Sequence, residues 1–182
     1  MNYWEEKIFF WKNKTDGNDI YKKQKNEVAS DLKEIIKREK IKRVIDVGGY
    51  DGIVGTLLPD GIEYINLDIK HGVDITSEWN KQKTLETLKK VKGTLIFTSL
   101  TLICIPPERM HELLREIRKY GDTFYFYEEK FNPEKYRDGQ QLSEEYGGKW
   151  IYDWKRLLAW GFWKTEESKV NPSWIRIWSR IR

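Results

Sequence analysis

A short apolar run passes into an acid and then a glycine-rich turn in the segment RVIDVGGYDG, residues 43–52. The β-branched residues before Asp46 are typical of a buried strand. Gly48 and Gly49 can adopt positive φ and carry no Cβ, so the backbone there can approach another group closely. The apolar residues after Gly52 predict that a helix follows at once, with free N–H groups at its start. Strand, glycine turn and helix in this order indicate a ligand-binding turn of an α/β fold.

The rest of the sequence alternates between patterns typical of helices and patterns typical of strands. Apolar residues at spacings of three and four predict a helix over residues 25–40. The helix over residues 106–121 begins at a proline pair and ends at a glycine. Helices are also predicted over 53–58, 81–91 and 153–162, and strands over 42–47, 62–69, 93–105 (running into a loop) and 122–129, with an antiparallel hairpin formed by 163–170 and 173–182 around Asn-Pro-Ser.

This order predicts a doubly wound α/β domain: a mostly parallel sheet with helices on both faces, closed by a C-terminal antiparallel β-hairpin. The chain has no internal repeat and no low-complexity linker, so we expect residues 1–182 to form a single domain. Residues 1–24, rich in aromatic residues and lysines, are expected to act as a lid or cap, and residues 131–150 to form an irregular insertion.

Composition excludes several classes of protein. The 33 basic and 29 acidic residues leave a net charge of +4, too small to indicate nucleic-acid binding by itself. No apolar run reaches the roughly 20 residues of a membrane-spanning helix. The first residues carry acids and no cleavage site, so no signal peptide is expected. The single Cys104 excludes an internal disulfide, is expected to be buried, and fits a reducing, cytoplasmic setting. No cluster of Cys or His indicates a metal.

Three interpretations of the glycine turn remain open on the residues alone. A nicotinamide site requires G-x-G-x-x-G, and the nearest frame here has Tyr50 in place of the first glycine. S-adenosylmethionine (SAM) carries no phosphate and favours an acid at the strand end, which Asp46 provides. Asp68 ends the next strand 22 residues after Asp46, near the offset at which an acid reaches ribose hydroxyls. The third interpretation is a tight connection that binds no ligand.

Residues 46–52 resemble motif I of class I SAM-dependent methyltransferases, with Asp46, Gly48 and Gly52 matching and Tyr50 replacing the middle glycine. The segments INLDI, GTLIFTSLTLICI, DTFYFYEE and the C-terminal hairpin are similar in order to the family's later strands, so the resemblance covers residues 25–182. It implies a seven-stranded sheet, SAM as cofactor and S-adenosylhomocysteine (SAH) as product.

The resemblance also implies roles for individual residues. Gly48, Gly49 and Tyr50 would border the methionine part of the cofactor, together with Ser99 at the end of the fourth strand of the family. Asp68 would bind the ribose hydroxyls and Ile69 would lie against the adenine. Asp74 would mark a shortened third strand near the adenine, or else cap a turn. Gly52 would pack the start of the helix against the strand.

The function implied is methyl transfer to an unidentified acceptor, with a small molecule or a protein side chain favoured. The segment CIPP lacks the polar first residue of the motif used for methylating bases, so nucleic acid is possible but not favoured. A methyltransferase-like domain without catalysis is the alternative, and a nicotinamide-dependent reductase is a third. Tyr50, His71, Glu128 and Glu129 are expected near the mouth of the site, and none is assigned as a base. The oligomeric state is left open.

Overall fold

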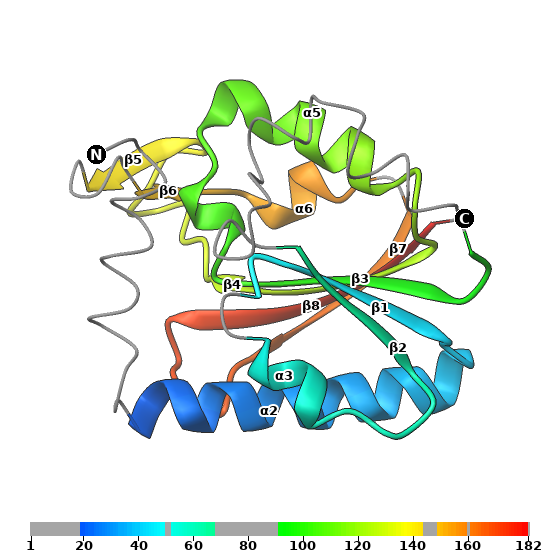
Figure 1. Cartoon of the computed structure of the whole chain (residues 1–182). Helices are drawn as coiled ribbons and strands as arrows, with labels where there is room; N and C mark the ends of the chain where they lie inside the picture. Colours follow the sequence, from blue (N-terminus) through cyan, green and yellow to red (C-terminus); the bar gives the residue numbers. More distant parts are fainter. Residues whose placement is uncertain (1–18, 50–51, 68–90, 144–148, 160, 182) are drawn as a thin grey trace, which may run out of the picture.

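The computed structural model describes residues 19–49, 52–67, 91–143, 149–159 and 161–181. Its main sheet lies between two layers of helices (Figure 1). The six strands of this sheet follow the order β2-β1-β3-β4-β8-β7. Their bounds are β1 Arg43–Val47, β2 Glu63–Leu67, β3 Thr94–Ser99, β4 Thr123–Glu129, β7 Gly161–Glu167 and β8 Trp174–Ile181.

The first four strands of the sheet run parallel: β1 pairs with β2 and β3, and β3 pairs with β4. Strand β8 is antiparallel to both β4 and β7. The α/β class is therefore confirmed. The sheet has six strands among the described residues, and the position expected for a further strand near Asp74 lies outside them.

Helix α2 (Asp19–Glu39) covers one face of the sheet. Its buried side contributes Val28, Leu32 and Ile35 to a core with Phe97 and Tyr125. The helix begins at residue 19, not at residue 25 as predicted, and so includes the end of the segment 1–24. The apolar stripe continues to Tyr21, but it passes through the polar Gln24, which interrupted the pattern in the sequence. The short helix α3 (Ile53–Thr56) lies on the same face (Figure 1).

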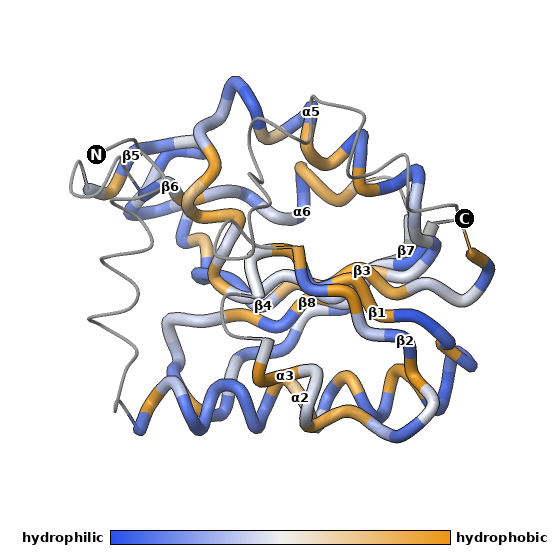
Figure 2. The backbone as a smooth tube through the Cα atoms, viewed as in Figure 1, coloured by the Kyte–Doolittle hydropathy of each residue, from blue (hydrophilic) through white to orange (hydrophobic). Residues whose placement is uncertain are grey.

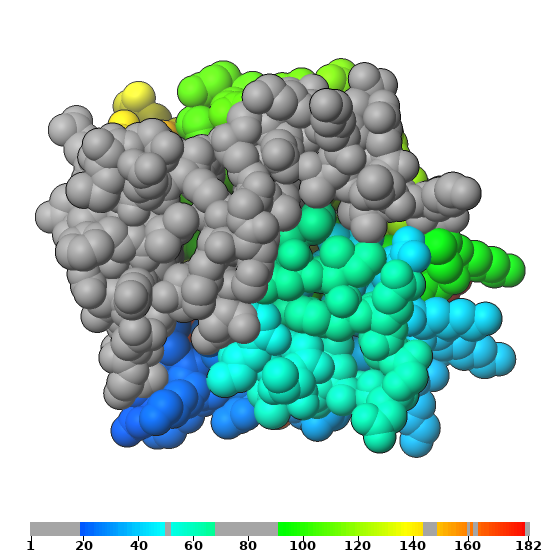
Figure 3. Space-filling model, viewed as in Figure 1, coloured from blue at the N-terminus to red at the C-terminus, as the bar shows by residue number. Residues whose placement is uncertain are grey.

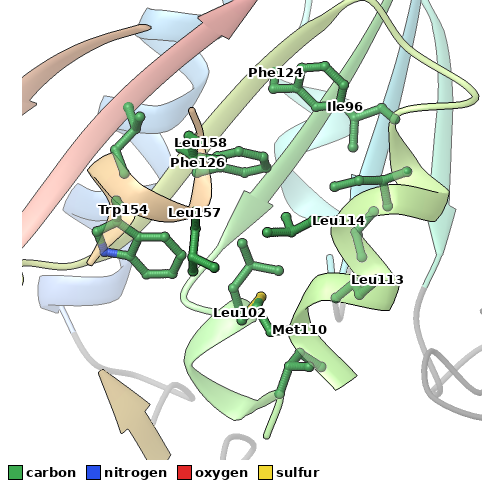
Figure 4. Packing of buried hydrophobic residues seen from close by; sticks show 14 of the residues in the cluster. Ile96, Leu102, Met110, Leu113, Leu114, Phe124, Phe126, Trp154, Leu157 and Leu158 are labelled. Carbon is green, nitrogen blue, oxygen red and sulfur yellow. The ribbon is translucent and has the colours of Figure 1, made fainter. Parts of the chain in front are cut away.

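Helices α5 (Pro107–Ile117) and α6 (Trp154–Leu157) cover the opposite face, together with the 3-10 helix η2 (Leu102–Cys104). Figure 4 shows Met110 and Leu114 of α5 directed toward Phe126 of β4. The hydropathy colouring shows the apolar side of α5 turned to the sheet and its polar side turned outward (Figure 2). Pro107 begins α5 as predicted, because proline lacks the N–H that the first helical turn cannot use.

Two of the following predictions differ from the structure, and a third falls almost wholly outside the part that the structure describes. The strand predicted over 93–105 ends at Ser99, and η2 follows it. The segment 131–150 is not wholly irregular, because β5 (Gln140–Ser143) pairs antiparallel with β6 (Lys149–Ile151). The helix predicted over 81–91 falls almost wholly outside the described residues. Cys104 is buried, as expected. None of the described helices has the length and apolar character needed to cross a membrane.

Candidate functional site

The site predicted at the glycine turn lies where the sheet changes its winding direction. From β1 the chain moves to β2 on one side, and it later returns to β3 on the other side. In register, Val47 at the end of β1 lies between Leu67 of β2 and Thr98 of β3. In open α/β sheets, ligands bind beyond the carboxyl ends of the strands at such a point. In Figure 3 the atoms of β2 and α3 lie at the surface of the face shown.

The glycine turn is tightly held. Gly48 has φ 80° and donates its N–H to the Leu67 carbonyl at 2.8 Å. Gly52 has φ 67°, donates to the Gly49 carbonyl at 2.8 Å and precedes α3 as its N-cap. A Cβ on Gly48 would lie 2.3 Å from Thr101 Oγ1, and one on Gly49 would lie 2.4 Å from Asp46 Oδ2. Larger residues are therefore excluded, at Gly48 by both backbone angle and space, and at Gly49 by space.

Asp46 lies under this turn and is 1% exposed. The Tyr64 hydroxyl donates a hydrogen bond to Asp46 Oδ2 at 2.5 Å. The Tyr64 ring also packs against Gly55, where a Cβ would lie 2.4 Å from the ring. Asp46 therefore supports the turn, and its predicted contact with the cofactor stays a prediction. Sequence reasoning missed Tyr64, although its alternation with Asn66 along β2 placed both on the Asp46 side of the sheet.

Ser99 ends β3 and receives a hydrogen bond from the side-chain amide of Gln24. Gln24 belongs to α2 and is 4% exposed. The N-terminal part of α2 therefore reaches the carboxyl-end edge of the sheet. Gln24 was assigned no role from sequence, because a polar residue at a buried helix position gives no signal of its partner.

The segment after β3, residues 100–105, forms the other side of the site, and we call it the β3 loop. Leu100 has φ 53° and donates its N–H to the Tyr127 carbonyl at 2.7 Å. Thr101 packs against Gly48. Glu128 of β4, which is fully buried, accepts hydrogen bonds from Thr98 Oγ1 at 2.8 Å and from the Leu102 N–H at 3.2 Å.

The structure thus brings together five of the predicted site residues: Asp46, Gly48, Gly49, Gly52 and Ser99. The other four, Tyr50, Asp68, Ile69 and Asp74, lie outside the described residues, as does His71. Within the described ranges, no group of three or more His, Cys, Asp or Glu side chains is arranged to hold a metal ion.

No protein-family model matches the sequence, and no curated protein matches it. Solved structures do resemble the fold. The N-terminal domain of EvdMO1, crystallised in the presence of SAH and D-fucose, gives a TM-score of 0.59 at 13% identity, covering 85% of this chain and 82% of that one. The mitomycin 7-O-methyltransferase MmcR gives 0.55 at 12% identity, covering 87% of this chain and 53% of that one.

The magnesium protoporphyrin IX methyltransferase ChlM from Synechocystis, solved with bound SAM, gives a TM-score of 0.50 at 15% identity. The alignment covers 91% of this chain and 84% of ChlM. At such identities the resemblance is one of fold.

Proposed function

We propose that this chain, which has the fold of class I SAM-dependent methyltransferases, binds SAM at the carboxyl ends of β1 and β3 and transfers its methyl group to an acceptor. The observation that carries the proposal is the glycine turn at the point where the sheet changes its winding direction, next to the Ser99 hydroxyl. The structural neighbours include proteins solved with SAH or SAM. A ligand without phosphate also fits the absence of the G-x-G-x-x-G frame.

We propose that the described part of the site binds the methionine end of SAM. Gly48 and Gly49 form the backbone of the turn, and the Ser99 hydroxyl accepts a hydrogen bond from Gln24. We assign Tyr50 and Gly52 to the same end from the motif. From the resemblance, we further propose that Asp68 binds the ribose hydroxyls, with Ile69 and Asp74 near the adenine. We also keep Asp46, which Tyr64 holds under the turn, as a proposed cofactor-binding residue.

When bound, SAM supplies a methyl group on a sulfonium, which is electrophilic without further activation. The protein then has to place the acceptor's lone pair in line with the bond that breaks, and positioning alone can lower much of the barrier. The acceptor's proton leaves to solvent or to a nearby base, and the proposal requires no dedicated base. We therefore assign no catalytic residue.

Cofactor binding is tested first by calorimetry with SAM and SAH. We expect both to bind the wild-type protein, and Asp68→Ala to weaken SAH binding by roughly 1.5–3 kcal/mol, the range for charge-assisted hydrogen bonds. Asp60→Ala, at an exposed turn, is the control and should bind as the wild type does. A wild-type protein that binds neither ligand at millimolar concentration would refute the proposal. Binding of NADH in their place would favour a reductase.

A second candidate is a methyltransferase-like domain that binds the cofactor or a partner without catalysis. The observation that favours it is Tyr50, which stands where the family has its middle glycine. The two candidates are distinguished by methyl transfer from labelled SAM to panels of small molecules, peptides and oligonucleotides. SAH binding without transfer to any of them would favour the second.

For the acceptor, we propose a small molecule or a protein side chain, with nucleic acid less favoured. Glu128 in the segment YEEKFNPE is buried, so the preference depends on Glu129 and Glu134, whose charges near the expected mouth disfavour a long phosphate backbone. We further propose that the aromatic residues before α2 act as a lid. Deleting residues 1–18 removes no part of α2, so we expect SAH binding to remain and methyl transfer to be lost. Loss of the folded state would show that the segment is part of the core.

A further inference from the structure

The β3 loop, residues 100–105, begins in a strained conformation. Leu100 has φ 53°, in the left-handed region that a branched side chain rarely adopts. Such a residue is strained, and it persists only where surrounding contacts hold it. The loop therefore needs firm attachment to the sheet. One attachment is the hydrogen bond from the Leu100 N–H to the Tyr127 carbonyl.

A second attachment is Glu128, the next residue along β4. Its Oε1 accepts from the Thr98 hydroxyl at 2.8 Å and from the Leu102 N–H at 3.2 Å. Leu102 is the first residue of η2, and Thr101, the N-cap, makes no side-chain capping bond. Because the first N–H groups of a helix lack internal partners, Glu128 caps η2 from the neighbouring strand.

The other oxygen of Glu128, Oε2, is buried and makes no hydrogen bond with the described residues. Burial raises the pKa of Glu128 to about 8, although the Thr98 hydroxyl and the backbone of Thr101, Leu102 and Ile103 act to lower it. At neutral pH the carboxyl is therefore mainly protonated. In that state Oε1 still accepts both hydrogen bonds, as a carbonyl oxygen does.

The loop that Glu128 caps bears directly on the glycine turn. Thr101 immediately precedes η2, and its side chain fills the space that a Cβ on Gly48 would occupy. A displacement of η2 would carry Thr101 away from Gly48. The contacts from Glu128 to the turn therefore run through η2 and Thr101.

Resting on the proposed function, we propose that Glu128 is a positioning residue for cofactor binding: its Oε1 fastens the β3 loop so that Thr101 holds Gly48 in place. What the loop requires is the reach of the side chain and an accepting oxygen, and a charge is not required. Glu128 itself touches neither cofactor nor acceptor in this account.

Two variants separate reach from charge. Glu128→Gln keeps the length of the side chain and one accepting oxygen without an ionisable group, whereas Glu128→Asp keeps the carboxyl but shortens its reach. We expect Glu128→Gln to bind SAH within about twofold of the wild type and Glu128→Asp about tenfold more weakly, the factor expected from losing one or two hydrogen bonds. Glu63→Gln, at the far end of β2 in a surface ion pair with Arg43, is the control and should bind normally.

Hydrogen exchange of residues 98–105 provides a readout that needs no cofactor. We expect the Leu102 amide to exchange faster in Glu128→Asp and at the wild-type rate in Glu128→Gln. If Glu128→Asp does not fold, Thr98→Val, which removes one donor to Oε1, should show the same effect to a smaller extent.

The outcomes are distinct. Wild-type exchange in Glu128→Asp would overturn the proposal. A loss of SAH affinity in Glu128→Gln as large as that in Glu128→Asp would also overturn it, because an accepting oxygen at the right reach would then not be enough. Faster exchange with unchanged SAH affinity would also overturn it. If the wild-type protein binds no SAH, the proposed function fails, whereas the exchange experiment still decides whether Glu128 fastens the loop.

Discussion

Gly48 and Gly49 are adjacent glycines required for different physical reasons. Gly48 has a positive φ and lies against Thr101, whereas at Gly49 a side chain would overlap the Asp46 carboxylate and Asn66. Asp46 in turn is held by Tyr64. The turn is therefore shaped by its supporting side chains as well as by its own backbone freedom.

Replacing Gly48 by alanine tests this account. We expect Gly48→Ala to lower the free energy of unfolding by about 2 kcal/mol or more, because strain and overlap with Thr101 add, and to weaken SAH binding. Gly61→Ala is the matched control, because Gly61 has φ 82° but no atom within 4 Å of the added Cβ. Gly61→Ala should lower the free energy of unfolding by about 1 kcal/mol, because only the strain of the left-handed conformation is added. Urea denaturation of both variants measures the difference, and equal costs would contradict it.

The C-terminal end of α2 offers a test at the level of the element. Lys40 follows the helix with φ 53°, and the Ile41 N–H donates to the Ile36 carbonyl at 3.0 Å. This is the geometry of a Schellman cap, in which glycine is favoured at the position of Lys40.

We therefore expect Lys40→Gly to raise the free energy of unfolding by roughly 0.5–1 kcal/mol, because the strain of a side chain in the left-handed region is removed. Lys37→Gly, at an exposed position inside the same helix, should instead lower it by about 1 kcal/mol. Thermal denaturation of the pair checks both signs. A lower free energy of unfolding for Lys40→Gly than for the wild type would show that the Lys40 side chain causes no strain at this cap.

A buried ionic cluster joins α2 to the C-terminal strands. Arg176 of β8, 4% exposed, contacts both Asp31 oxygens at 3.0 Å and Glu166 at 2.9 Å. The Tyr125 hydroxyl also donates to Asp31, at 2.6 Å. Burial raises the pKa of Asp31 despite its contact with Arg176. The cluster connects residues more than a hundred positions apart, so it forms only when the whole sheet is assembled.

Removing the cation of this cluster leaves the largely buried Asp31 without its ionic partner. We expect Arg176→Ala to lower the free energy of unfolding by about 3 kcal/mol or more, as for other buried pairs that lose one member. Arg180→Ala is the control, because Arg180 is 65% exposed in its pair with Glu39 and should cost less than about 1 kcal/mol. Chemical denaturation compares the two, and similar costs would contradict a role for the cluster in stability.

At the scale of the whole molecule, Glu128 makes stability depend on pH. Its pKa is raised by burial from 4.5 to about 8. The unfolded chain loses this proton near pH 4.5, whereas the folded chain keeps it until about pH 8. The contribution of protonated Glu128 to the free energy of unfolding is therefore complete below pH 4.5. It is lost as the pH rises toward 8, at about 1.4 kcal/mol per pH unit.

The reference is the difference in the free energy of unfolding between Glu128→Gln and the wild type at pH 4. As the pH rises from 5 to 8, we expect this difference to shift in favour of Glu128→Gln. Urea denaturation at several pH values measures this difference, in which the other titrating groups cancel. Glu63→Gln should follow the wild type, because Glu63 lies in an exposed pair. A difference between Glu128→Gln and the wild type that does not change with pH would show that Glu128 is ionised in the folded protein.

The sequence by itself determined the class of the fold, the order of most elements and the place of the turn. These features depend on short-range patterns: the spacing of Val28, Leu32 and Ile35, the proline that begins α5, and the glycines after β1. Each is a property of a few neighbouring residues, so it can be recognised from a short stretch of sequence.

Only the tertiary structure decided which side chains meet at the site. Gln24 reaches Ser99 across 75 positions, Tyr64 reaches Asp46, and Glu128 reaches the N–H of Leu102. These contacts follow from strand order, from register and from the face of the sheet that each helix covers. A polar residue at a buried position looks the same in the sequence whichever partner it finds. Its role is set when packing brings distant segments together, because a buried hydrogen-bonding group must then be satisfied by whatever lies opposite.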